Sequence, residues 1–291
     1  MNAQALCWIN QQVIPAAEAK ISVFDHGLLY GDGIFEGLRF YQRKVFRLDA
    51  HLQRLQHSAA ALTLKLPMSL AEIRAAIEQL IAQYAHDDGY LRLVITRGAG
   101  SLGIDPQKCA KPDMFIIADA LSVVNHEDAD SGISLLIAST RRMPAQCLNP
   151  RIKSLNYLNN ILARIEANDA GMDEALMLNT QGFVSEGTVD NLFIICDGVL
   201  VTPPVSDGLL QGITRDCILQ VAEQSGISCQ QTSLTPYDLL QADECFLSGT
   251  GAELIPVSQI NQHRFATPPQ PLYPVIERAF RQLIQRECAG G

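Results

Sequence analysis

The sequence predicts a mixed α/β (α+β) fold in two domains, and three observations support that prediction. The chain has 291 residues, which is longer than most single domains. Short runs that alternate apolar and polar residues, typical of strands, lie between longer runs with apolar residues at helical spacing. The acidic stretch NHEDADS at 125–131 has no periodicity, which is typical of a linker. We therefore expect a small domain at 1–120, a linker at 121–131 and a large domain at 132–291.

The small domain is expected to begin with strands and hairpins and to continue with two helices. Residues 1–48 alternate in short runs such as ALCWINQQVI and IFEGLRFY. The run at 48–62 has leucines at helical spacing, and Asp49 is its expected N-cap. The run at 69–84 predicts a second amphipathic helix, which Ser69 would cap. Two further strands are expected at 89–100 and 113–124, with a turn-rich loop at 101–111.

The large domain is expected to contain a strand, a helix and a β meander in that order. The strand is ISLLIAST, and the helix is Leu155–Ala170, which Gly171 would end. The meander runs from 174 to 204, with a turn at Asp197–Gly198. The remaining expected elements are helices at 213–226 and 235–242, a strand–turn–strand unit at 244–260 and a closing helix at 271–288.

Composition excludes several classes of function. The net charge is 22 minus 31, or −9, which disfavours nucleic acid as a main partner because phosphate neutralisation needs clustered Lys and Arg. No run reaches the length of a membrane span, and the first residues do not resemble a signal peptide. The eight cysteines form no CxxC pair and no zinc-like cluster, so we expect no metal site and reduced thiols in a cytoplasmic protein.

Lys153 is the first candidate for chemistry. The chain has six lysines, and this one is the only lysine from Pro112 to the end, although arginine is frequent there. Lysine can lose its proton, whereas arginine cannot. The expected helix start and the neighbouring Arg151 would both lower its pKa, as a Schiff-base amine requires. A solvated surface lysine is the ordinary alternative.

Glu186 and two glycine turns are the next candidates. Glu186 stands in an apolar, semi-buried part of the meander, so it needs either an arginine partner or a pyridinium ring nitrogen. The turn LLQGITRD places Gly212, Ile213 and Thr214 at a helix start, where free amides can bind an anion. Thr250 in FLSGTGAEL could add a hydroxyl. Each turn alone could equally be an ordinary capped turn.

Arginines set in apolar strands are the last candidates. Arg39 in FEGLRFY and Arg92 in GYLRLVI each need a carboxylate, which a substrate or an internal ion pair could supply. Glycines at 31, 33 and 37 allow a close approach of ligand or backbone beside Tyr30 and Phe35.

These stretches together resemble the class IV aminotransferases, which are fold-type IV PLP-dependent enzymes. The resemblance runs from about residue 22 to 258 and rests on YGDGIFEGLR, HLQRL, RIKSLNYLNN, VSEGTVDNLF, LQGITRD and SGTGAE, in that order. Within the class, FEGLR, YLRLVITRG, SLGIDPQKCAKP and GTGAE are most similar to branched-chain amino acid aminotransferases. The resemblance implies a small α/β domain and a larger pseudo-barrel domain that binds pyridoxal 5'-phosphate (PLP).

The resemblance also implies a role for each candidate residue. Lys153 would bind PLP as a Schiff base and then act as the proton shuttle, and Glu186 would pair with the pyridine nitrogen. Tyr157, one turn after the lysine, would hydrogen-bond the phenolic oxygen, and Leu210 would pack on the ring. The implied phosphate ligands are Arg54, Ile213, Thr214 and Thr250, with Gly212 at the same helix start. The implied substrate residues are Tyr30, Phe35, Arg39, Tyr90, Arg92, Thr250 and Gly251, the last of which replaces a usual alanine.

The expected function is transamination between a branched-chain L-amino acid and 2-oxoglutarate. D-amino acid transamination and aminodeoxychorismate lyase activity on the same scaffold remain alternatives, and a non-catalytic protein that binds a phosphorylated metabolite is a further one. The expected partners are small-molecule amino acids and 2-oxo acids. The resemblance also implies a homodimer in which the loop at 101–111 contacts the partner.

Overall fold

A computed structural model describes residues 4–120, 132–265 and 271–289. The chain divides into two compact units, one of residues 1–121, 152–156 and 286–291 and the other of 122–151 and 157–285. The expected linker at 121–131 lies outside the described residues. None of the helices within the described ranges is both long and apolar enough to cross a membrane.

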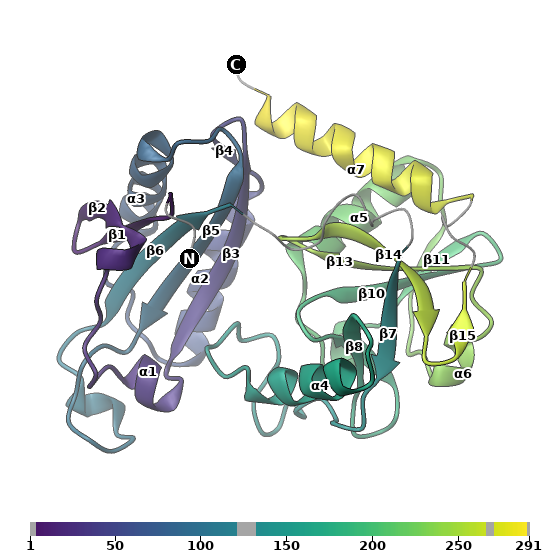
Figure 1. Cartoon of the computed structure of the whole chain (residues 1–291), viewed down its shortest axis with the longest axis horizontal. Helices are drawn as coiled ribbons and strands as arrows, with labels where there is room; N and C mark the ends of the chain where they lie inside the picture. The colour runs from purple at the N-terminus through teal and green to yellow at the C-terminus, as the bar shows by residue number, and fades with distance from the viewer. Residues whose placement is uncertain (1–3, 121–131, 266–270, 290–291) are drawn as a thin grey trace. The chain divides into compact units, whose positions relative to one another are not determined.

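The first unit contains a six-stranded antiparallel sheet with the order β2-β1-β6-β5-β3-β4 (Figure 1). A short helix, α1, precedes β3 and ends at Tyr30. The long central strands follow from runs of β-branched and aromatic residues. The bounds of the strands and of α1 are β1 Leu6–Ile9, β2 Gln12–Pro15, α1 His26–Tyr30, β3 Gly33–Tyr41, β4 Lys44–Val45, β5 Gly89–Thr96 and β6 Asp113–Asp119.

Two helices, α2 (Leu48–Ala61) and α3 (Leu70–Gln83), pack on one face of this sheet and bury its core. Ser69 caps α3 as expected, because its hydroxyl and the Glu72 carboxylate form a reciprocal capping box. The expectation that Asp49 caps α2 is wrong. The N-cap is Arg47 in the left-handed region, with φ 54°, and Asp49 lies inside the first turn.

The segment 152–156 adds an extra strand-like edge to β3. The Phe35 N–H donates to the Lys153 carbonyl at 3.0 Å, and the Leu155 N–H donates to the Gly33 carbonyl at 2.9 Å. Because this backbone is used for pairing, the following helix α4 spans Leu158–Asp169 and does not begin at residue 155. The expectation that Lys153 stands at a helix start is therefore wrong.

The second unit contains a nine-stranded mixed sheet in which β12-β11-β10-β13-β14-β7-β8-β9 are neighbours and β15 pairs with β14. Strand β9 is at one end of this order, and β10 is near the other end. A tight turn joins the two strands, with the Gly187 N–H donating to the Asp190 carbonyl at 2.7 Å. The sheet is thus curved into a half-barrel. Its core holds leucine, isoleucine and valine side chains. The strand bounds are β7 Ile133–Ile137, β8 Glu174–Leu178, β9 Val184–Gly187, β10 Asn191–Cys196, β11 Val199–Thr202, β12 Cys229–Gln231, β13 Glu244–Gly249, β14 Glu253–Ile260 and β15 His263–Arg264.

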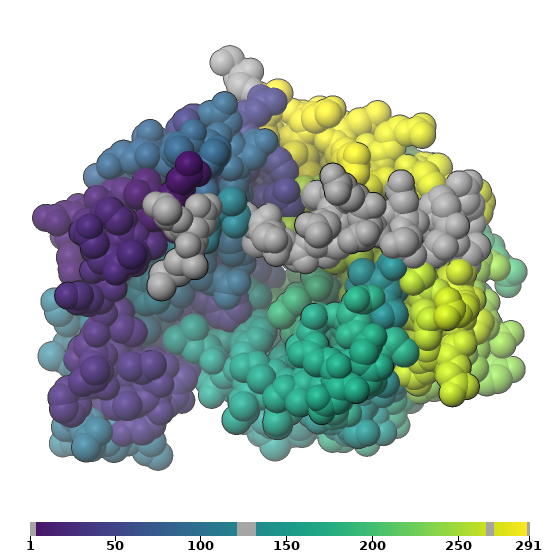
Figure 2. Space-filling view, viewed as in Figure 1, coloured from purple at the N-terminus to yellow at the C-terminus, as the bar shows by residue number. Residues whose placement is uncertain are grey.

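Four helices belong largely to this unit: α4, α5 (Ile213–Gln224), α6 (Pro236–Leu239) and α7 (Tyr273–Cys288). Helix α4 lies at the surface of the unit (Figure 2) and packs Ala163 and Ala167 against the alanine and methionine side chains of β8. The observed positions of α5, α6 and α7 agree with the helical runs predicted from the sequence. The mixed α/β architecture with a half-barrel confirms the expected fold class.

Candidate active site

Lys153 is held at the edge of the first unit's sheet. Its backbone N–H donates to the Ser58 hydroxyl at 3.2 Å, and Ser154 forms an antiparallel bridge with Ile34. Its Nζ atom lies 4.5 Å from the centre of the Phe35 ring. The side chain is half-buried, so the lysine is not an ordinary solvated surface residue.

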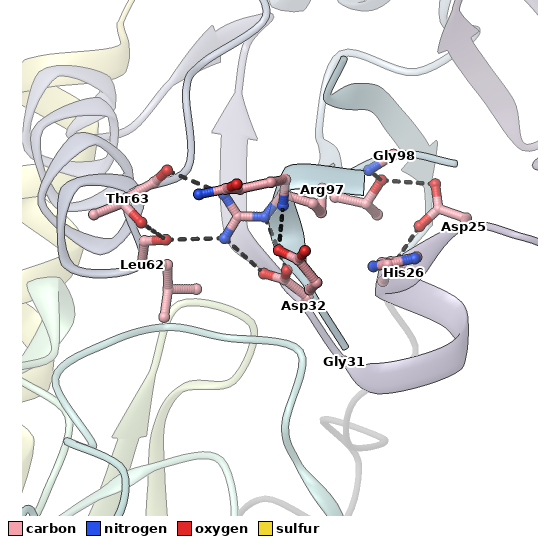
Figure 3. A network of polar contacts seen from close by, with 12 residues as sticks. Asp25, His26, Gly31, Asp32, Leu62, Thr63, Arg97 and Gly98 are labelled. Carbon is pink, nitrogen blue, oxygen red and sulfur yellow. Dashed lines mark hydrogen bonds and ion pairs between the residues drawn. The ribbon is translucent and has the colours of Figure 1, made fainter. Parts of the chain in front are cut away.

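A turn at residues 31–33 supports this segment. The Asn156 Nδ2 donates to the Gly31 carbonyl at 2.9 Å, next to the Leu155 contact with Gly33. Arg97 braces the turn, because its Nε and Nη2 atoms lie 2.8 and 3.0 Å from the Asp32 carboxylate (Figure 3). The same guanidinium donates to two carbonyls at the C-terminal end of α2, those of Leu62 and Thr63.

Four of the expected substrate residues share one face of this sheet. Arg39 pairs directly with Tyr90 across β3 and β5, and Gly37 pairs with Arg92, so these side chains and Phe35 emerge on the same side. The Arg92 guanidinium carbon lies 4.7 Å from the Phe35 ring centre, and its Nη2 donates to the Tyr90 hydroxyl at 2.9 Å. The face therefore combines aromatic surface with cations beside the Lys153 amine.

The absence of a side chain at position 37 has a steric explanation. A Cβ atom at this position would lie 2.1 Å from the Tyr90 hydroxyl oxygen, so the tyrosine occupies the space that a side chain would need. Tyr30, the fifth expected substrate residue, ends α1 and accepts a hydrogen bond from the Gly103 N–H at 2.9 Å.

Arg54 belongs to a buried polar cluster on the opposite face of β3. Its Nε and Nη2 donate to the two Glu36 oxygens at 2.8 and 2.7 Å, and the His51 Nδ1 donates to the same carboxylate at 2.8 Å. Burial alone would raise the pKa of Glu36, but the Arg54 charge and the hydrogen bonds from Arg54 and His51 outweigh it and lower that pKa to about 2. Burial lowers the pKa of His51, and the Arg54 and Lys153 charges lower it further against the opposing effect of Glu36.

Glu186 is the centre of a second polar cluster, in the second unit. It is 5% exposed on β9, and its Oε1 accepts from Arg142 Nη2 at 2.6 Å. Its Oε2 accepts from the Leu210 N–H at 3.1 Å and from Asn191 Nδ2 at 3.3 Å. The arginine partner considered from the sequence is thus present, and it keeps this buried carboxylate charge-compensated.

Helix α4 orients Arg142 through an amide. The Arg142 Nη1 donates to Asn160 Oδ1 at 2.8 Å, and Asn160 Nδ2 donates to the Thr188 carbonyl at 2.6 Å. Arg142 Nε also donates to the Gly208 carbonyl at 3.2 Å. Tyr157 is the N-cap residue of α4 and is half-buried, so the expected one-turn helical relation to Lys153 is wrong.

The start of α5 lies close to Glu186 and has no side-chain cap. Gly212 is the N-cap, and it has no side chain with which to occupy the amides of the first turn. A Cβ there would lie 2.1 Å from Asn191 Oδ1, so the approach of the asparagine requires glycine. Ile213 and Thr214 follow as buried first-turn residues.

Thr250 and Gly251 lie in the turn between β13 and β14. Asn191 of β10 pairs with Ser248 of β13, which brings this turn to the same end of the sheet as the Glu186 cluster. A Cβ at Gly249 would lie 1.9 Å from Asp190 Oδ1, so the turn is closely packed against the β9–β10 connection.

Glu36, His51, Arg142 and Asn191 belong to these clusters, although no sequence pattern indicated them as site residues. The available signal for Glu36 was a charged residue inside the apolar run IFEGLRF, which requires a buried partner. No local pattern indicated that His51 and Arg54, one helical turn apart, would supply it, because the contact joins a strand to a helix.

The residues present fit PLP. The first unit holds a half-buried amine at 153, and the second holds a buried carboxylate at 186 and a helix start without a side-chain cap at 212. Groups of these kinds suit an aldehyde, a ring nitrogen and a phosphate.

Comparisons with known proteins agree with this chemistry. The family model for class IV aminotransferases matches residues 33–260. A putative branched-chain-amino-acid aminotransferase of Methanocaldococcus jannaschii is 48% identical over 254 residues, which is 87% of each chain. The branched-chain-amino-acid aminotransferase of Escherichia coli K12 is 34% identical over 260 residues, covering 87% of this chain and 84% of that protein.

Solved structures agree over almost the whole chain. The crystal structure of the E. coli branched-chain amino acid aminotransferase has a TM-score of 0.92 at 32% identity, covering 97% of this chain and 95% of that one. The branched-chain amino acid aminotransferase of Thermobaculum terrenum, in its PLP-bound form, has a TM-score of 0.87 at 29% identity, with 97% and 94% covered. The chain therefore belongs to the class IV aminotransferases, the fold-type IV enzymes that depend on pyridoxal 5'-phosphate.

Proposed function

We propose that the protein transfers the amino group between a branched-chain L-amino acid and 2-oxoglutarate. The observation that carries the proposal is the position of the Lys153 amine, 4.5 Å from the Phe35 ring centre, on a sheet face that also presents Arg39, Tyr90 and Arg92. An apolar ring suits a branched side chain, and an arginine suits a carboxylate. The relatives named as branched-chain aminotransferases support the same substrate class.

Lys153 and Glu186 are assigned the central roles. When bound, PLP supplies an electron sink that stabilises negative charge developing at the α-carbon of an amino acid. The Lys153 amine would hold the cofactor through its aldehyde group, and as a free amine it would take the α-proton of the amino acid and return it. Glu186 holds a proton on the ring nitrogen, and the ion pair with Arg142 orients the carboxylate for this.

The other cofactor residues bind and orient. Arg54 and the first-turn amides of α5 hold the phosphate, because a guanidinium and a helix start both favour a dianion. Leu210 packs on the ring, and its N–H fixes the Glu186 carboxylate. The assigned cofactor residues are Arg54, Lys153, Tyr157, Glu186, Leu210, Gly212, Ile213, Thr214 and Thr250.

The substrate residues divide into cationic and apolar groups. Arg39 and Arg92 attract the substrate's carboxylates, and Phe35 provides the apolar surface. Arg92 is exposed and pairs with the Tyr90 hydroxyl, so the tyrosine limits its freedom. Tyr30, Thr250 and Gly251 complete the assigned set.

Half-reaction spectra test this function. L-leucine, D-alanine and aminodeoxychorismate are each supplied to the PLP-loaded protein without any 2-oxo acid. We expect L-leucine to convert the cofactor to its pyridoxamine form, and 2-oxoglutarate added afterwards to restore the starting spectrum. Conversion by D-alanine with no response to L-leucine would refute the proposed stereochemistry, and pyruvate release from aminodeoxychorismate would indicate a lyase.

We also propose a homodimer in the cytoplasm, with a small domain at 1–120 and a large domain at 132–291. All eight cysteines are free thiols, which suits a reducing compartment. The loop at 101–111 exposes Leu102 and Ile104, at 72% and 81%, and a partner subunit could cover them. Sedimentation velocity that shows only a monomer at micromolar concentration would contradict the dimer.

A further inference from the structure

A polar stripe runs along helix α2 within the otherwise apolar core of the first unit. His51 and Arg54 are one helical turn apart, and both meet Glu36 of β3. Glu36 is 0% exposed, His51 is 1% exposed and the Arg54 side chain is 14% exposed. Burying these three polar side chains costs desolvation free energy, and apolar residues could fill the same space. The cluster is therefore a candidate for a role beyond stability.

The geometry fixes which edge of the arginine is used for this contact. Glu36 accepts from the Nε and Nη2 atoms, and a guanidinium is a planar fork. The edge formed by Nη1 and Nη2 therefore points away from Glu36. An arginine held along one edge has the direction of its other edge fixed as well, and bidentate phosphate recognition needs two parallel N–H groups in a fixed direction.

A hydrogen bond from His51 holds the Glu36 carboxylate in its orientation. Its Nδ1 donates to Oε2, the same oxygen that accepts from Arg54 Nη2. Because the pKa of His51 is lowered, the imidazole is neutral near pH 8, and its effect there is a hydrogen bond without added charge. Removing this N–H leaves the net charge of the cluster unchanged and frees the carboxylate to rotate.

We propose that His51 and Glu36 are positioning residues that hold Arg54 in the orientation that binds the cofactor's phosphate. The proposal rests on the proposed function, because it assumes that Arg54 contacts PLP. It assigns a cofactor-selecting role to a histidine that lies one contact from Glu36, two from Arg54 and three from the phosphate.

The test measures the selectivity for PLP over pyridoxal, which lacks the phosphate. Dissociation constants of both are determined at pH 8 by absorbance titration of the full-length protein after its cofactor has been removed. We expect His51→Phe, which keeps a ring but lacks the N–H donor, to lower the PLP-over-pyridoxal selectivity about tenfold, the scale of one hydrogen bond to a charged group. Pyridoxal affinity itself should stay within about twofold, because pyridoxal has no phosphate to misplace.

Three controls separate positioning from general damage. His51→Asn should restore the selectivity, because its amide nitrogen can replace Nδ1 as donor to Glu36. His57→Phe makes the same substitution on the same helix at an exposed histidine and should change nothing. His51→Leu also lacks the N–H donor. Its PLP-over-pyridoxal selectivity replaces that of His51→Phe if His51→Phe fails to fold.

A double-mutant cycle assigns the effect to Arg54. Arg54→Lys should lower the selectivity by itself, and adding His51→Phe should then lower it no further. An unchanged selectivity in both His51→Phe and His51→Leu, or an equal additional loss in the Arg54→Lys background, would overturn the positioning role. If Arg54→Lys leaves the selectivity intact while PLP still binds, the phosphate role of Arg54 is wrong and the inference falls with it. If the unmodified protein binds no PLP, the proposed function itself fails.

Discussion

The Arg142 guanidinium compensates the negative charge of the buried Glu186 carboxylate. Glu186 is 5% exposed, and a lone ionised carboxylate at that depth would lose far more hydration energy than two neutral donors can return. The guanidinium at 2.6 Å supplies the missing charge, and the Asn160 amide holds it in place. The proposed electronic role of Glu186 therefore depends on a residue that would not touch the cofactor.

Replacing Arg142 should destabilise the folded protein. We expect Arg142→Gln to reduce the free energy of unfolding by about 3 kcal/mol, because it leaves Glu186 buried without its counter-charge. Urea unfolding followed by circular dichroism measures the change. The adjacent Arg141 is exposed, so Arg141→Gln is the matched control and should stay within about 0.5 kcal/mol of the parent protein. Equal losses in both variants would refute the assignment.

Glu36 predicts a definite dependence of stability on pH. Its pKa is about 2 in the folded protein against an ordinary 4.5, so the folded state favours the ionised form. This contribution is fully present above pH 4.5 and is lost as the pH falls from 4.5 toward 2, and its size is of the order of a few kcal/mol. His51 acts in the same direction, because its lowered pKa makes protonation below pH 6.5 unfavourable in the folded state.

The pH effect can be isolated by comparison with Glu36→Gln. We expect the free energy of unfolding of the parent protein to fall more steeply between pH 5 and pH 3 than that of the variant. Urea titrations at fixed pH values measure both slopes. Parallel slopes would mean that Glu36 does not carry the acid sensitivity.

At the scale of elements, the pairing of β3 with β5 decides the composition of the substrate face. Direct cross-strand partners share a face, so Arg39 beside Tyr90 and Gly37 beside Arg92 follow from the register. A shift of one residue would move all these side chains into the α2 and α3 core. The absence of a side chain at Gly37 is what lets Tyr90 reach Arg92.

Gly37→Ala tests this arrangement. The new methyl group would lie 2.1 Å from the Tyr90 hydroxyl oxygen, so the ring must move and its hydrogen bond with Arg92 Nη2 is broken. We expect the KM for the amino acid to rise about tenfold while PLP affinity is unchanged, since only substrate binding is disturbed. In a Tyr90→Ala background the methyl group meets no ring, and the same substitution should add nothing. A similar rise in both backgrounds would contradict the steric explanation.

At the scale of the whole molecule, local signals predicted the order of the elements. Ser69 indicated where α3 begins, and the turn at Gly212 indicated where α5 begins, because caps are set by nearby residues. The family motifs indicated most of the candidate site before any contact was known. The sequence also predicted the half-barrel, but only through the family resemblance.

Long-range contacts account for what could not be predicted. Helix α4 begins at Leu158 because the backbone around Lys153 pairs with β3, more than a hundred residues earlier in the chain. Glu36 meets Arg54, and Arg142 meets Glu186, through contacts between separate elements. Such partners leave no periodic pattern in one sequence, and only the folded chain identifies them.

The central claim is that Lys153 forms the bond to the cofactor, and chemical trapping tests it most directly. The PLP-loaded protein is reduced with borohydride and digested, and the phosphopyridoxyl label is located among the six lysines by mass spectrometry. We predict that the label is on Lys153 alone and that Lys153→Arg remains unlabelled. A stable label on any other lysine of the active protein, or activity retained by Lys153→Arg at the parent rate, would contradict the account.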